Sequence, residues 1–178
     1  MSATNNFVFK ALYIVAWIIF VGLCIEAGAL LVNFVFSLFK PEVVKNLYQK
    51  LDLSDVYNRS QFVYFSVYSL IIAIAVLKAY LFYIIIKLVS KINLEKPFTN
   101  TVAKQILQIS YHTFSIGIVS YIAKEATKNL EHHGFVVDKI NNFWVDGQAF
   151  ILMAGIIYVI AIIFSKGIEL QEEKDLTI

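Results

Sequence analysis

Four long apolar runs constrain the fold of this chain more than any other feature of its sequence. They cover residues 11–39, 62–90, 102–123 and 147–166, and none contains proline. A helix that crosses a bilayer needs about 20 predominantly apolar residues, so each run is long enough for one crossing. Hydrophobic residues make up 59% of the 178 residues and charged residues only 16%. The sequence therefore predicts an all-α fold: a single membrane domain built as a bundle of four transmembrane helices.

Two opposite charges interrupt the first two runs. Glu26 is the only charged residue in residues 11–39, and Lys78 is the only one in residues 62–86. Each lies near the middle of its run, so antiparallel neighbouring helices place the two groups at similar depths. Since an unpaired charge in the bilayer core costs at least about 3 kcal/mol, we expect a structural Glu26–Lys78 ion pair.

Two other arrangements of these charges stay open at the level of sequence. In one of them, Glu26 and Lys78 belong to a proton or ion relay that includes His112 and Asn33. In the other, one or both groups extend to the headgroups or face a water-filled cleft.

Within the third run, residues 106–123 are uncharged but semi-polar, which predicts that this span lies against other helices rather than against lipid. Two of its small residues, Ser115 and Gly117, would let a neighbouring backbone approach closely. The polar residues of the run are Gln108, Ser110, His112, Thr113, Ser115 and Ser120.

The four crossings place both termini and the connection between the second and third runs on one side of the membrane. Lys and Arg total seven on each side, and Lys78 is the remaining one of the 15. The connection holds Lys87, Lys91, Lys96 and Lys104 against Glu95, and this density of lysine favours the inner side of a bacterial plasma membrane. Within it, Pro97 ends the second helix and Thr99 is the expected N-cap of the third.

The two connections on the outer side predict less about the structure than the four apolar runs do. Residues 40–55 place apolar residues at helical spacing after Pro41, which predicts a short amphipathic helix lying along the outer membrane interface. Phe143 and Trp144 are expected to anchor at that interface. His132 and His133 are adjacent, so their side chains diverge and a metal site is not expected.

The sequence contains no feature that points to catalysis. We find no phosphate-binding loop, nucleophile elbow or metalloprotease signature, so we expect neither an enzyme nor a cofactor or metal. The formal net charge of +2 gives no reason to expect direct nucleic-acid binding. The partners expected from composition are the lipid bilayer and, in a homo-oligomer, further copies of the chain.

The chain ends in a short acidic segment, Gly-Ile-Glu-Leu-Gln-Glu-Glu-Lys-Asp-Leu-Thr-Ile, over residues 167–178. Gly167 is a plausible C-cap for the last span. Apolar residues alternate at Ile168 and Leu170, and again at Leu176 and Ile178, which favours an extended tail. Three states stay open: the tail folds back on the basic connection, binds a protein partner, or is disordered.

Two segments on the same side of the membrane carry a family resemblance. They are the Leu-Glu-Lys-Pro-Phe-Thr stretch of residues 94–99 and the acidic motif of residues 167–178. With four spans in about 180 residues, the chain resembles the YoaS-like family of small bacterial membrane proteins (domain of unknown function 2975). Members of that family are often encoded beside a small helix-turn-helix regulator, so the resemblance implies a membrane partner for a cytoplasmic DNA-binding protein.

These observations lead to one hypothesis with one alternative. The first is a non-enzymatic regulatory membrane protein that binds or sequesters a helix-turn-helix regulator. The alternative is a small transporter, channel or immunity-type protein that uses Glu26, Lys78 and His112. The residues assigned to partner docking are Lys91, Lys96, Pro97, Phe98, Thr99, Lys104, Glu169, Leu170, Glu172, Glu173, Asp175, Leu176 and Ile178.

Overall fold

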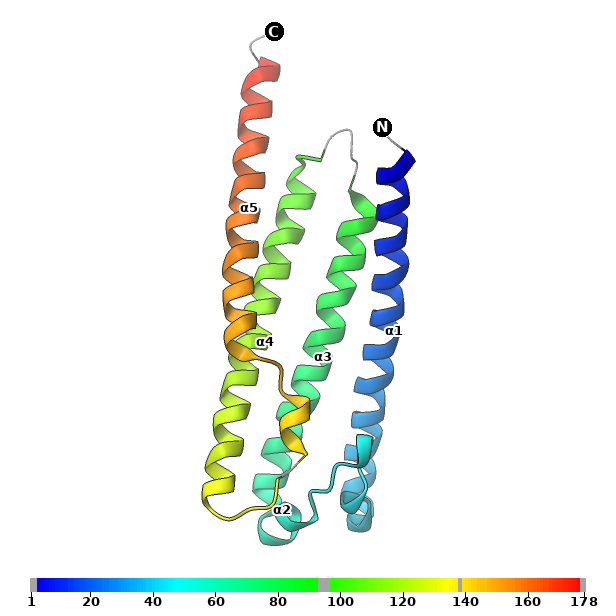
Figure 1. Cartoon of the computed structure of the whole chain (residues 1–178), viewed down its shortest axis with the longest axis vertical. Coiled ribbons are helices and arrows are strands. Elements are labelled where there is room, and N and C mark those ends of the chain that lie inside the picture. The colour runs from blue at the N-terminus through cyan, green and yellow to red at the C-terminus, as the bar shows by residue number, and fades with distance from the viewer. Residues whose placement is uncertain (1–2, 93–96, 138, 177–178) are drawn as a thin grey trace.

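The computed structural model describes residues 3–92, 97–137 and 139–176 of the chain, and it confirms the all-α prediction. The described part contains helices and turns but no β-strand. Figure 1 shows the order of the elements along the chain. They are α1 (Ala3–Phe39), the 3₁₀ turns η1 (Pro41–Lys45) and η2 (Tyr48–Lys50), α2 (Ser54–Arg59), α3 (Gln61–Lys91), α4 (Asn100–His132), η3 (Ile140–Phe143) and α5 (Gly147–Leu176).

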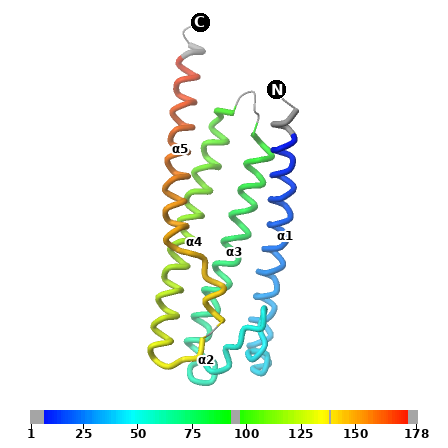
Figure 2. The backbone as a smooth tube through the Cα atoms, in the orientation of Figure 1, coloured from blue at the N-terminus to red at the C-terminus, as the bar shows by residue number. Residues whose placement is uncertain are grey.

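The four long helices lie side by side in chain order, as Figures 1 and 2 show. The main contacts are those of α1 with α3, α3 with α4, and α4 with α5. Each of these helices is long and apolar enough to cross a membrane, so the prediction of four membrane-spanning helices is confirmed. Both described ends of the chain lie at the same end of the bundle (Figure 1).

The helix α5 is displaced along the bundle axis relative to its neighbours. It begins at Gly147, which packs against Gly117 near the middle of α4. A Cβ atom added to Gly117 would lie 3.0 Å from both Gly147 O and Ile151 N, so the two backbones touch here. The other end of α5 therefore extends beyond the rest of the bundle (Figure 1).

The end of the bundle opposite the two termini has a hydrophobic core of its own. We call it the outer cap and the other end the inner end, after the topology predicted from the sequence. The apolar segment of α1 has 33 residues, about 50 Å of helix, whereas the hydrocarbon core of a bilayer is about 30 Å thick. One end of α1 therefore projects from the hydrocarbon. At the outer cap, α1 and α3 pack against the connecting segments through buried residues that include Leu30, Val44, Leu47, Leu51, Leu53, Val56, Tyr64, Tyr68, Val137, Ile140 and Phe143.

This core overturns two predictions about the outer connections. Residues 40–55 form two 3₁₀ turns and the start of α2 rather than one interfacial helix. Gln49 and Lys50 have positive φ angles (57° and 59°), which interrupt a continuous helix. The apolar residues of this segment face protein instead of lipid, and Phe143 is 7% exposed in the same core rather than anchored at the membrane surface.

The polar residues of the third span pack against other helices only in part, because Gln108 is exposed. Ser110, Thr113 and Ser120 are buried, and the Ser110 hydroxyl donates a hydrogen bond to Ala154 O on α5 at 2.9 Å. Of the two small residues, Gly117 lies at the α4–α5 contact, whereas Ser115 donates to Tyr111 O of its own helix. Thr99 is the N-cap of α4, since its hydroxyl accepts a hydrogen bond from Val102 N at 3.3 Å.

Candidate functional site

The structure brings together the two charges that interrupt the first two spans. Lys78 Nζ lies 2.9 Å from Glu26 Oε1, and the two side chains are 22% and 19% exposed. Ala27, Ala75 and Ala79 are buried next to them in sequence, and such small residues allow α1 and α3 to approach closely. The geometry is that of a hydrogen-bonded ion pair that joins two membrane-spanning helices.

The ion pair lies close to the level at which α5 begins. The rings of Tyr80 and His112 are in edge contact at 4.7 Å, which aligns α3 with α4. Lys78 is two residues from Tyr80 on α3, and Gly117 is five residues from His112 on α4, in the same direction along the bundle. At 1.5 Å per residue, Lys78 and Gly117 are therefore about 5 Å apart along the axis, and α5 starts at Gly117. If the apolar residues of α5 mark the hydrocarbon, the pair is near its outer boundary rather than at its centre.

The two residues proposed as further members of a relay make other contacts. The Asn33 side-chain amide donates a hydrogen bond to Ala29 O, one turn earlier in α1, at 3.0 Å. The His112 ring packs against Tyr80. Neither of these contacts extends from the Glu26–Lys78 ion pair.

At the inner end, the structure joins the two segments that carry the family resemblance. Phe98, in the segment before α4, packs against Phe164 of α5 with ring centroids 5.2 Å apart and ring planes tilted by 47°. A Cβ atom added to Gly167 would lie 2.8 Å from the Phe98 ring, so only glycine permits this approach without a shift. We call Phe98, Phe164 and Gly167 the aromatic corner. Neither Phe164 nor the packing role of Gly167 was expected from the sequence.

The acidic segment is helical rather than extended, and Gly167 is not a C-cap. The helix α5 continues without interruption through Gly167 to Leu176. Glu, Gln, Leu and Lys, which dominate this segment, are strong helix formers. Lys166 Nζ also lies 2.6 Å from Glu169 Oε2, an (i, i+3) pair that supports a helix. The prediction of an extended tail, which rested on two short alternations of apolar residues, was therefore wrong. The many strong helix formers in the segment favour a helix more than those alternations favour a strand.

The other docking residues that the structure describes lie on the segments at the same end of the bundle as the aromatic corner. Lys91 and Lys104 are exposed on α3 and α4, and Pro97 and Thr99 flank Phe98. Leu170 is 66% exposed, whereas Ile168 is 7% exposed. Glu169, Glu172 and Glu173 are exposed along α5, and the backbone of Asp175 and Leu176 belongs to the same helix; Lys96 and Ile178 lie outside the described residues.

A shallow cavity of about 170 Å³ adjoins the aromatic corner between α4 and α5. Its polar walls come from Asn100, Lys104 and Ser165, and its apolar walls include Leu107 and Ala161. Together with the projecting end of α5, it gives the inner end of the bundle an irregular surface with both charged and apolar parts.

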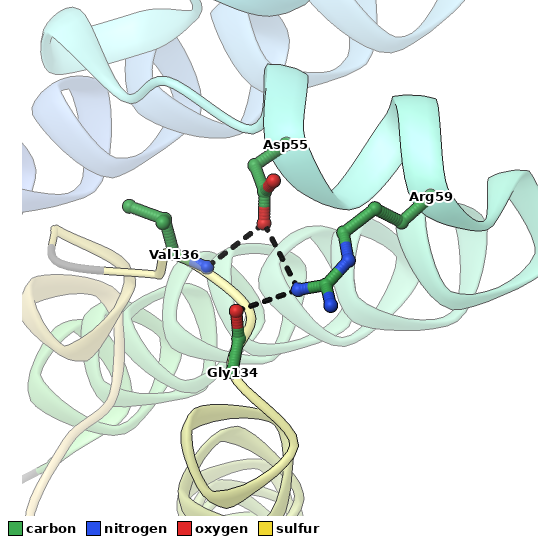
Figure 3. Close-up of polar contacts among 4 residues, drawn as sticks. All are labelled: Asp55, Arg59, Gly134 and Val136. Atoms are coloured by element: carbon green, nitrogen blue, oxygen red, sulfur yellow. Dashed lines mark hydrogen bonds and ion pairs between the residues drawn. The ribbon is translucent and has the colours of Figure 1, made fainter.

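At the outer end, polar contacts tie the two outer connections together, as Figure 3 shows. Asp55 Oδ2 accepts a hydrogen bond from Val136 N at 3.0 Å and lies 3.7 Å from Arg59 Nη1. The same guanidinium donates to Gly134 O and lies over the Phe135 ring, 4.4 Å from its centroid. These contacts link α2 to the segment that follows α4, and no sequence signal pointed to them.

Two other polar groups of the outer cap, Asp52 and His133, have structural partners. Hydrogen bonds from Ser54 hold the pKa of Asp52 below its ordinary value, and the charges of Lys45 and Lys139 act in the same direction. His133 Nδ1 lies 2.8 Å from Asn129 O. Within the described residues, no group of three or more His, Cys, Asp or Glu side chains is arranged to hold a metal ion.

Comparison with known proteins identifies a family without a known activity. The family model described as "Protein of unknown function (DUF2975)" matches residues 46–178, which include α2 to α5, the aromatic corner and the acidic helix. No curated protein and no solved structure matches the chain. Because the match covers most of the sequence, the chain belongs to the DUF2975 family of proteins of unknown function.

Proposed function

We propose that this protein is a non-enzymatic regulatory protein of the bacterial inner membrane that binds a cytoplasmic helix-turn-helix transcription regulator. The docking surface consists of the aromatic corner, the flanking lysines and the acidic end of α5. A regulator held at the membrane in this way leaves fewer free copies to bind DNA. The observation that carries the proposal is the projection of α5, as an acidic helix, beyond the other three long helices (Figure 1).

The distribution of lysine supports an inner location for this end of the bundle. Lys10, Lys87, Lys91, Lys104 and Lys166 are all exposed near the inner ends of the four long helices. Basic residues that flank spans are enriched on the cytoplasmic side.

The form and charge of the projecting helix suit a protein partner. Glu169, Glu172 and Glu173 are exposed together with the apolar side chain of Leu170. A DNA-reading domain presents a basic surface, which complements these carboxylates. An anionic membrane surface would instead repel them. The aromatic corner holds the base of the helix, so a partner meets a preorganised surface rather than a flexible chain.

The proposal is tested by recruitment of the helix-turn-helix regulator that it predicts beside this gene. The regulator is fused to a fluorescent protein and co-expressed with the full chain or with variants, and its membrane-bound fraction and promoter output are measured. We expect deletion of residues 169–178 to release the regulator from the membrane. Glu172→Pro should act similarly, because proline costs about 3 kcal/mol in a helix interior, whereas Glu172→Ala should have a smaller effect.

The matched control is the double substitution Glu26→Gln/Lys78→Gln, which alters the membrane part of the protein and leaves the docking surface unchanged. We expect it to keep recruitment. Unchanged recruitment and promoter output after deletion of residues 169–178, with normal amounts of protein in the membrane, would contradict the proposed function.

A second candidate is a small transporter or channel, and the partial exposure of the Glu26–Lys78 pair is the observation that favours it. About one-fifth of each side chain is accessible, and ionisable residues inside membranes often mark ion pathways. Loss of a measured ion or proton flux in reconstituted Glu26→Gln protein, with recruitment unaffected, would favour this function over the first.

A further inference from the structure

An open cavity of about 440 Å³ lies in the outer cap beside α4. It exists because α5 begins only at the level of Gly117, so the segment before Gly147 lines the outer half of α4 in place of a helix. Because the apolar part of α5 begins at this level, we expect the cavity to lie next to the membrane surface on the predicted outer side. The polar and aromatic residues that line it are Lys124, Lys128, Glu131, Asn141, Trp144 and Asp146.

Most of the charged groups in this cavity already have partners. Lys128 Nζ lies 2.6 Å from Glu125 Oε1. Asp146 Oδ1 accepts hydrogen bonds from the first N–H groups of α5, at 3.1 and 3.2 Å. Lys124, in contrast, is exposed and forms no ion pair within the described part of the chain. Its ammonium group is therefore available to an anion.

The aromatic wall of the cavity is held in place. Trp144 Nε1 donates a hydrogen bond of 3.0 Å to the hydroxyl of Thr127, which is buried. Glu131, at the far end of the cavity, accepts one weak hydrogen bond from Asn141 Nδ2 at 3.4 Å. An ionised carboxylate can accept several hydrogen bonds, so Glu131 can also receive those of an ammonium group.

The charges follow an order along the membrane normal. Lys124 is one turn beyond Tyr121, whose backbone packs against Gly147, and Glu131 is seven residues further out. The free cation is therefore on the membrane side of the cavity, and the carboxylate is about 10 Å farther from the membrane. In a phosphoethanolamine headgroup the phosphate likewise lies next to the acyl chains, and the ammonium group lies farther out.

We propose that this cavity binds the phosphoethanolamine headgroup of an outer-leaflet lipid. The phosphate contacts Lys124, the ammonium group contacts Glu131, and Trp144 forms the wall between them. Toward the membrane, Tyr121 and Ile122 are 46% and 54% exposed, so the acyl chains meet an apolar surface. This inference is independent of the proposed docking function at the inner end.

Tryptophan fluorescence tests the inference directly, because the chain has only two tryptophans. The substitution Trp17→Phe leaves Trp144 as the single reporter. Soluble glycerophosphoethanolamine is titrated into this variant in a detergent without phosphate. We expect a saturable change in Trp144 emission. We further expect Lys124→Ala and Glu131→Gln each to weaken binding about tenfold or more, whereas Lys45→Ala, in η1 and outside the cavity, should not.

Two comparisons separate the possible ligands. Glycerol 3-phosphate, which lacks the ammonium group, should bind at least about tenfold more weakly, and equal binding of the two compounds would overturn the assignment of a zwitterion. Nanodiscs with and without phosphatidylethanolamine then test the lipid itself, and we expect the emission change only with that lipid. The same Trp144 emission in both kinds of nanodisc would overturn a lipid source. No saturable change with any ligand, or equal effects of Lys124→Ala and Lys45→Ala, would overturn the binding site.

Discussion

At the scale of single residues, the charge pair between the first two spans is the clearest link from sequence to structure. Two charges at similar depths in apolar runs predicted a contact, and Lys78 Nζ lies 2.9 Å from Glu26 Oε1. The depth of the pair in the membrane could not be predicted in the same way. That depth depends on where α5 begins, which is set by the packing of Gly147 against Gly117.

Replacing only one residue of this pair should destabilise the protein, and replacing both should cost less than the sum of the two single changes. We expect Glu26→Gln or Lys78→Gln to destabilise the protein by about 3 kcal/mol, because either change leaves a charge unpaired in a mostly buried site. The double substitution should cost less than the sum of the two single ones, by about 1–3 kcal/mol of coupling. Reversible unfolding in detergent measures these values, and strictly additive effects would show that the two groups are not energetically coupled.

Gly167 offers a second test on the scale of one residue. A methyl group at this position would meet the Phe98 ring at 2.8 Å, so we expect Gly167→Ala to destabilise the inner end by about 1–2 kcal/mol. Gly155→Ala is the matched control, because a Cβ atom there meets nothing within 4 Å. That control should be neutral or slightly stabilising, since alanine is the better helix former.

The same substitution should lose its effect when the ring is absent. In a Phe98→Ala background, we expect Gly167→Ala to behave like Gly155→Ala. Thermal unfolding of the unchanged protein, of Gly167→Ala, of Phe98→Ala and of the double variant measures the destabilisation in each background. A penalty that persists without the ring would mean that Gly167 is required for a reason other than contact with Phe98.

At the scale of secondary-structure elements, the long helices could be predicted and the short ones could not. Helices of about 30 residues follow from apolar runs and from local signals such as the Thr99 N-cap. The segment of residues 40–55 has the spacing of an amphipathic helix, yet Gln49 and Lys50 adopt positive φ angles and its apolar residues enter the cap core. Tertiary contacts with α1 and α3 determine that outcome, and a local pattern does not contain them.

The crossing of α4 and α5 yields a prediction at this scale. At Gly117, an added Cβ atom would meet backbone atoms of Gly147 and Ile151 at 3.0 Å, and backbone cannot move aside as a side chain can. We expect Gly117→Ala to destabilise the protein by about 3 kcal/mol. The control is Gly28→Ala in α1, where a Cβ atom meets nothing within 4 Å. Equal unfolding midpoints for the two variants would contradict the close approach of the helices.

At the scale of the whole molecule, the displacement of α5 gives the two ends of the bundle different characters. The outer cap encloses an aromatic and aliphatic core and a charged cavity. The inner end presents the aromatic corner and an acidic helix. The sequence predicted that the acidic segment and the Pro-Phe-Thr stretch share one side of the membrane. It did not predict their contact, because this requires the position of Phe164 relative to Phe98.

We propose that α5 carries its acidic end to the cytoplasmic side of the membrane and that the outer cap lies on the opposite side. Cysteine labelling tests it in a Cys24→Ser background, which removes the single native cysteine. Leu170→Cys and Asn58→Cys each place a thiol at an exposed position, one at either end of the bundle. With a membrane-impermeant maleimide, we predict labelling of Asn58→Cys in intact spheroplasts, and of Leu170→Cys only after permeabilisation. Labelling of Leu170→Cys in intact spheroplasts would contradict the account.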